Sequence, residues 1–155
     1  MEIFSDMSPY RHMVAPYFFK DVFNIGWIDF GAYEQGDVPD GLLEKLRSLA
    51  FGLFLPGCIV EPARGNPICP VCGPLVEHFG GRALREAELW IPDGHRVFAS
   101  PVQIVHFIQV HGYRPPDQYL DAVGRLSPSQ VFDGDALYRE KLNECGWQPG
   151  SSTAG

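Results

Sequence analysis

Two cysteines separated by two residues form the most chemically specific segment of the sequence. They are Cys69 and Cys72, in the run Cys-Pro-Val-Cys-Gly. Thiolates at this spacing can both bind one ion at about 2.3 Å when the chain between them turns tightly, and proline and glycine favour such a turn. Because one pair supplies only half of a tetrahedral ligand set, two further ligands must come from elsewhere in the chain.

His106 and His111 are the leading candidates for the two remaining ligands. Their spacing, with four residues between them, lies within the range seen at zinc sites that also contain a Cys-x2-Cys pair. On a regular helix such positions point about 140° apart, so we expect the helix to loosen at its end, where Gly112 follows. Two thiolates and two imidazoles favour zinc. His78 and Cys58 are alternative ligands.

The same residues allow other interpretations, which stay open at this point. Cys69 and Cys72 can be reduced thiols in a loop that binds no metal. They fit a redox pair less well, because a thioredoxin-like pair should begin a helix after a strand. His106 lies in an apolar stretch, where a lone histidine is more often a hydrogen-bonded core residue than a ligand.

Charge and composition exclude several classes of function. The chain of 155 residues carries a net charge of −7 and contains no basic run, whereas a surface that binds phosphates needs clustered lysine and arginine. We therefore expect neither nucleic acid nor an anionic membrane as a partner. No apolar stretch approaches the roughly 20 residues that span a bilayer, and the N-terminus lacks the pattern of a signal peptide. These features predict a cytoplasmic protein whose cysteines stay reduced.

The pattern of elements predicts a single α+β domain over residues 1–147, followed by a flexible tail over 148–155. A strand is predicted over 22–30, and an Asp-Gly turn between two β-prone runs predicts a hairpin near 86–99. We expect a small antiparallel sheet packed by three to four helices, with a zinc ion as a cross-link. Helices are predicted over 40–51, 101–111, 116–124 and 134–145. The second of these is apolar around most of its circumference, which predicts a central buried helix whose first cap is Ser100.

Four sequence blocks resemble those of a family of uncharacterised bacterial proteins. The blocks are NIGWID at 24–29, RGNPICPVC at 64–72, ELWIPDGHRVFASP at 88–101 and IVHFIQVHGYRPPDQYLDAV at 104–123. The resemblance covers most of the chain from about residue 20 to 125, and its order of blocks is specific. It implies one domain, a bacterial origin and a cysteine–histidine site, and it implies no particular substrate.

No familiar catalytic motif occurs in the sequence, whether a nucleophile elbow, a phosphate-binding loop or a His-Glu-x-x-His helix. Asp29, Asp117 and Asp121 could serve as catalytic carboxylates. Asp117 is more readily explained as an acidic residue that stabilises the first turn of a helix. We therefore predict a non-enzymatic binding domain that recognises a peptide or protein partner and contains a structural metal site. The alternatives are an immunity or antitoxin protein, and an enzyme with a catalytic zinc or a carboxylate pair.

Aromatic residues are the best candidates for contact with a partner. They make up 13 % of the chain and crowd the first third, and such residues are enriched at interfaces. A core rich in rings accounts for most of them. Some should nevertheless line an exposed patch that includes at least one of Tyr17, Phe19, Trp27 and Tyr113.

Overall fold

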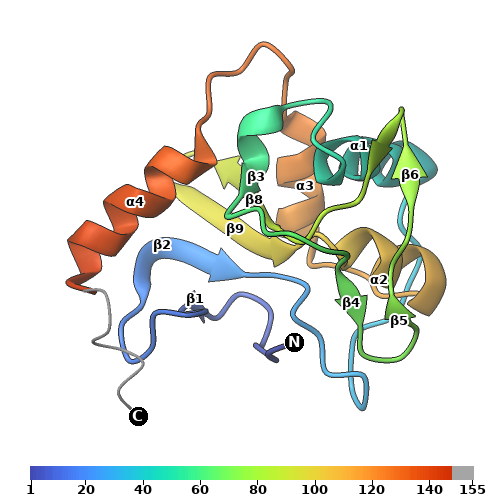
Figure 1. The fold of residues 1–155 in the computed structure, drawn as a ribbon, viewed down its shortest axis with the longest axis horizontal. Coiled ribbons are helices and arrows are strands. Elements are labelled where there is room, and N and C mark those ends of the chain that lie inside the picture. The colour runs from blue at the N-terminus through green and yellow to red at the C-terminus, as the bar shows by residue number, and fades with distance from the viewer. Residues whose placement is uncertain (148–155) are drawn as a thin grey trace.

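The computed structural model describes residues 1–147 and is built around a five-stranded sheet. The tail that was predicted to be flexible, 148–155, lies outside the described residues. The strand order is β1-β2-β9-β8-β3, and Figure 1 shows the sheet passing through the centre of the molecule. The strands are β1 (Pro9–Tyr10), β2 (Phe19–Asn24), β3 (Ile59–Val60), β8 (Glu88–Asp93) and β9 (Arg96–Pro101).

The hairpin predicted from the Asp-Gly turn is the longest pairing of the sheet. β8 and β9 pair antiparallel from Glu88↔Pro101 to Asp93↔Arg96, and Gly94 in the turn has a φ of 64°, which glycine adopts without steric cost. One neighbouring pair departs from the expected antiparallel pattern, because β2 runs parallel to β9. Parallel neighbours need a long crossover connection, and here that connection contains β3, β8 and the whole cysteine-bearing segment.

Four helices cover the sheet and confirm the predicted α+β class. They are α1 (Asp40–Ala50), α2 (Ile104–His111), α3 (Asp117–Arg125) and α4 (Gly134–Cys145). The residues of β8 alternate between two cores, since Leu89 and Ile91 pack with α1, α2 and α3 while Trp90 packs with Tyr138 of α4. Strand side chains point alternately to the two faces, so α4 covers one face and the other three helices cover the opposite one (Figure 1).

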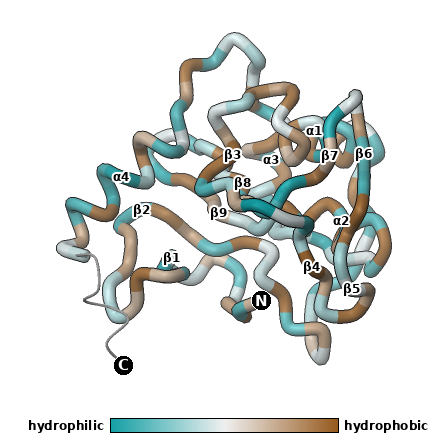
Figure 2. Tube along the Cα trace, in the orientation of Figure 1, coloured by the Kyte–Doolittle hydropathy of each residue, from teal (hydrophilic) through white to brown (hydrophobic). Residues whose placement is uncertain are grey.

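The apolar helix α2 is the most buried of the four, as its sequence predicted. Ile104, Val105, His106, Phe107 and Ile108 are all buried, and Figure 2 shows hydrophobic residues along α2 where α4 carries more hydrophilic ones. None of the helices within residues 1–147 is long and apolar enough to cross a membrane.

The start of α2 differs from the prediction. The helix begins at Ile104, and Ser100 and Pro101 are instead the last residues of β9. Ser100 is buried, and its hydroxyl donates to the carbonyl of Leu89 at 3.1 Å and contacts the hydroxyl of Tyr119 at 3.0 Å. The serine and proline resembled a helix cap locally, but pairing with β8 extends the strand through both of them.

The segment between β3 and β8 contains two small hairpins and little other regular structure. One hairpin joins β4 (Ile68–Cys69) to β5 (Gly73–Pro74), and the other joins β6 (His78–Phe79) to β7 (Arg82–Ala83). A short 3₁₀ helix, η1 (Pro56–Cys58), precedes β3. Figure 1 shows both hairpins on the same side of the molecule as α1 and α2.

Candidate metal centre

The first hairpin holds the two cysteines of the Cys-x2-Cys motif. Cys69 pairs with Gly73 across the turn, and Gly73 has a φ of 87°, a conformation that is costly for residues with a Cβ. The tight turn leaves Cys69 buried and Cys72 exposed. The hairpin therefore presents two thiols from one short loop, one facing inward and one at the surface.

The end of α2 is wider than a regular α-helix, and this widening brings the two histidines together. The N–H of Gly112 donates to the carbonyl of Phe107, five residues back, and the N–H of Tyr113 donates to the same carbonyl at 3.1 Å. A regular turn closes with a bond to the fourth residue back. A wider turn adds less rotation per residue, so His111 comes round toward His106, and their ring centroids lie 5.1 Å apart.

The structure gathers Cys69, Cys72, His106 and His111 into one group that could hold a metal ion. One ligand atom from each residue lies within 4.8 Å of the other three. The Sγ atoms of Cys69 and Cys72 are each 3.5 Å from Nε2 of His111. In a tetrahedral zinc site with ordinary bond lengths, a sulfur and a nitrogen ligand are about 3.5 Å apart, so these separations already fit an ion.

The two alternative ligands lie outside this group. Cys58 is buried in the hydrophobic core, where desolvation raises the pKa of its thiol to about 12. His78 is exposed on β6. The four residues favoured by the spacing argument are thus the ones that the fold brings together.

His106 gives the clearest sign that this cluster is suited to bind an ion, because one of its ring nitrogens has no hydrogen-bond partner among residues 1–147. Its Nε2 atom is buried and makes no hydrogen bond within the described part of the chain. Leaving a buried polar atom without a partner costs about 1–3 kcal/mol. Burial lowers the pKa of His106, the nearby Glu77 opposes this effect, and His111 lowers the pKa further. The lowered pKa favours the neutral imidazole, which is the form that binds metals.

The electrostatics of the two thiols also suit a bound cation. The pKa of Cys72 is raised by desolvation and then by the hydrogen bond and charge of the adjacent Cys69. Two neighbouring thiolates repel each other, and a divalent cation between them reverses the effect and stabilises both charges. The donor set of two sulfurs and two imidazole nitrogens suits zinc in both type and number.

Two aromatic residues that the sequence did not single out hold His111 in place. The hydroxyl of Tyr33 donates to the backbone carbonyl of His111 at 2.8 Å. The ring of Phe30 meets the His111 ring edge to face, with centroids 5.0 Å apart. Both lie some 80 residues before His111 in the chain, and no local pattern connects them to it.

The aromatic residues chosen as partner contacts lie mostly in the interior. Phe19, Trp27 and Tyr113 are buried. The polar atoms of Trp27 and Tyr113 form hydrogen bonds within the protein. Nε1 of Trp27 donates to the carbonyl of Ala99, and the hydroxyl of Tyr113 donates to Asp6 at 2.8 Å. The exposed patch that we expected therefore depends on Tyr17, which is half-buried and lines a surface hollow with Phe18.

Two of the three carboxylates named as catalytic candidates, Asp29 and Asp117, are engaged in local roles. Asp29 accepts a hydrogen bond from the N–H of Gly31, and Asp117 pairs with Arg114 at 2.8 Å. Among residues 1–147 the buried acid is Glu88, which sequence reasoning missed because it lies within an apolar strand. Both its oxygens accept from the hydroxyl of Tyr10.

The fold and this group define an α+β domain with a cysteine–histidine cluster between a two-stranded hairpin and a helix end. The chain belongs to the family described as a domain of unknown function, DUF7919, whose model matches residues 2–124. That stretch includes all four residues of the cluster. Comparisons with curated proteins and with solved structures gave no match.

Proposed function

We propose that this chain is a non-enzymatic binding domain that recognises a peptide or protein partner and is held together by one structural zinc ion. The ligands would be Cys69, Cys72, His106 and His111. The observation that carries the proposal is that four protein side chains lie together, with the Nε2 atom of His106 buried and unpaired. Four protein ligands complete a tetrahedral set, as in structural sites, whereas catalytic zinc keeps one position for water.

The position of the cluster supports a structural role for the ion. The segment from residue 61 to 87 has only strands of two residues, yet it contributes Cys69, Leu75 and Leu84 to the hydrophobic core. An ion bound by Cys69, Cys72 and the end of α2 would tie this segment to the central helix. The free energy of metal binding then becomes free energy of folding.

The competing functions find less support. A catalytic zinc would need an open coordination position, and the exposed Cys72 would occupy it. An immunity or antitoxin protein is compatible with the net charge of −7, but no contact in the described residues favours it over other binding domains. A reducing cytoplasm, as expected for a bacterial cytoplasmic protein, would keep the thiols available for zinc.

Metal analysis of the purified protein tests the proposal. Protein produced with ample zinc under reducing conditions should contain close to one zinc per chain, and Cys69→Ser should lose it and melt at a lower temperature. Cys145→Ser is the matched control, because the Cys145 thiol donates to the carbonyl of Leu142, far from the cluster, and a hydroxyl preserves that bond. Wild-type protein that contains no zinc would refute the metal centre.

A pull-down from the native host tests the binding role separately. A specific peptide or protein should be recovered by the wild type, and recovery should fail after changes to the surface residues that bind it while the fold stays intact. Turnover of a small molecule that is lost on replacing Cys72, in a protein that remains folded, would favour the enzyme instead.

A further inference from the structure

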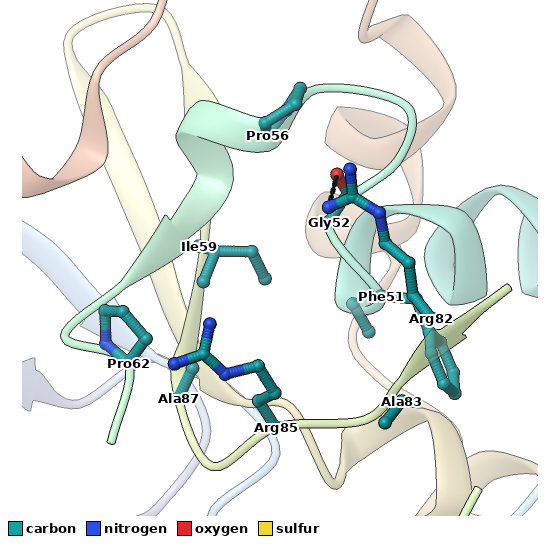
Figure 3. Close-up of a pocket in the computed structure, with 10 residues that line it drawn as sticks. Phe51, Gly52, Pro56, Ile59, Pro62, Arg82, Ala83, Arg85 and Ala87 are labelled. Carbon is teal, nitrogen blue, oxygen red and sulfur yellow. Dashed lines mark hydrogen bonds between the residues drawn. The ribbon is translucent and has the colours of Figure 1, made fainter. Parts of the chain in front are cut away.

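A second hollow, separate from the metal centre, lies between the end of α1, η1 and β7. It encloses about 410 Å³, and Figure 3 shows the side chains around it. Its apolar wall is formed by Phe51, Ile59 and Ala87 among others. Arg82 of β7 and Arg85, which follows β7, extend into the same space (Figure 3).

The charge of this hollow is opposite to that of the whole protein. The chain carries a net charge of −7, yet the lining contains two arginines and no acidic residue. The neighbouring acids Glu61, Glu86 and Glu88 line a different hollow. Neither arginine forms an ion pair with an acidic residue among residues 1–147.

The guanidinium groups of the two arginines differ in their hydrogen-bond partners. Nη1 of Arg82 donates to the carbonyl of Gly52, just past the end of α1, at 3.4 Å. Arg85 is exposed and has no hydrogen bond or ion pair with any residue between 1 and 147. Its donors therefore face the hollow without a partner.

We propose that this hollow binds the C-terminal residue of a partner peptide, with the carboxylate on Arg85 and an apolar side chain against Phe51 and Ile59. This inference rests on the proposed role in peptide recognition and names the class of ligand. A guanidinium presents planar, paired donors that match a carboxylate. The apolar wall lies in the same small space, so the ligand must carry an anion and an apolar group close together.

A terminal residue meets this requirement better than an internal acidic one. A C-terminal leucine or valine presents its carboxylate and its apolar side chain from one Cα atom. The side chain of aspartate or glutamate presents a carboxylate with only one or two methylene groups. The mixed lining of the hollow therefore favours a chain end with an apolar last residue.

Calorimetric titration with two short peptides tests the proposal. The probe is an acetylated tetrapeptide of three alanines and a final leucine with a free carboxylate, and its counterpart ends in an amide. The acid should bind at least tenfold more tightly than the amide. Arg85→Gln should remove that preference, whereas Arg139→Gln, which changes an exposed arginine on α4, should leave it unchanged.

Several results would overturn the inference. The inference is wrong if the peptide acid does not bind, or if the acid and the amide bind equally. It is also wrong if folded Arg85→Gln keeps the preference for the acid. Displacement of the peptide by millimolar inorganic phosphate would show a general anion site instead. The metal proposal is judged by zinc content alone. A protein that contains zinc but does not bind the peptide therefore refutes only the proposed peptide site at Arg85. If a native partner is still captured by folded Arg85→Gln, the binding role stands and this site is again refuted.

Discussion

The buried carboxyl of Glu88 should make the stability of this protein fall as the pH rises. Tyr10 donates to both its oxygens, and Nε1 of Trp90 donates to Oε1 at 2.9 Å. Burial nevertheless dominates and raises the pKa of Glu88 from its ordinary 4.5 to about 7, with smaller contributions from the charges of Glu61 and Glu86. The perturbation that tests this is Glu88→Gln, which keeps the shape and removes the titration.

The sign and size of the effect follow from the two pKa values. Below pH 4.5 both the folded and the unfolded carboxyl bind the proton, and between 4.5 and 7 mainly the folded one does. The stability due to this group is therefore complete below the unfolded pKa and is lost as the pH rises through the folded pKa. Each tenfold change in proton affinity is worth about 1.4 kcal/mol, so the loss is roughly 3 kcal/mol in total, and most of it falls between pH 5 and pH 8.

Urea unfolding followed by tryptophan fluorescence measures this change. The free energy of unfolding is determined at several pH values from 5 to 8 for the wild type and for Glu88→Gln. His12 and His106, whose pKa values are lowered by burial, push the pH dependence in the opposite direction but are common to both proteins. The difference between the two proteins therefore isolates Glu88. The reasoning is wrong if the two curves run parallel across this range.

Three further substitutions test core packing and helix capping, with a fourth, Gly41→Ala, as a control. Phe107→Ala removes a fully buried ring of α2 and should lower the free energy of unfolding by about 3–5 kcal/mol; a loss under roughly 1 kcal/mol would place α2 at the periphery. Gly57→Ala should also destabilise strongly, by about 1–3 kcal/mol, because its Cβ would overlap the carbonyl oxygen of Phe132, whereas Gly41→Ala meets nothing within 4 Å and should not destabilise in the same denaturation assay. Asp133→Ala removes the side-chain acceptor for the N–H of Ala136 at the start of α4 and should cost about 1 kcal/mol, with no change in zinc content.

The sequence predicted those features that depend on neighbouring residues. The Asp-Gly turn located the β8–β9 hairpin, and Gly112 marked a helix end that the structure places next to it. The Cys-x2-Cys motif and the two histidines were found because ligand spacing is a local property of the chain. The same local logic misassigned Ser100, since its environment is set by pairing with β8 rather than by its neighbours in the sequence.

Tertiary structure alone decided which distant groups meet. Cys69 and His111 are 42 residues apart in the chain, and Tyr10 and Glu88 are 78 apart, distances at which no periodicity carries information. Composition could not separate aromatic residues of the core from those of the surface, so Trp27 and Tyr113 were candidates for a patch although both are buried. Burial also sets the electrostatics, because desolvation acts only once the fold has closed around a group. Residue types and spacing thus predicted the four cysteine and histidine residues that could hold a metal and most of the elements. Packing determined the widened end of α2, the buried acid and the hollow in which Arg85 has no partner among residues 1–147.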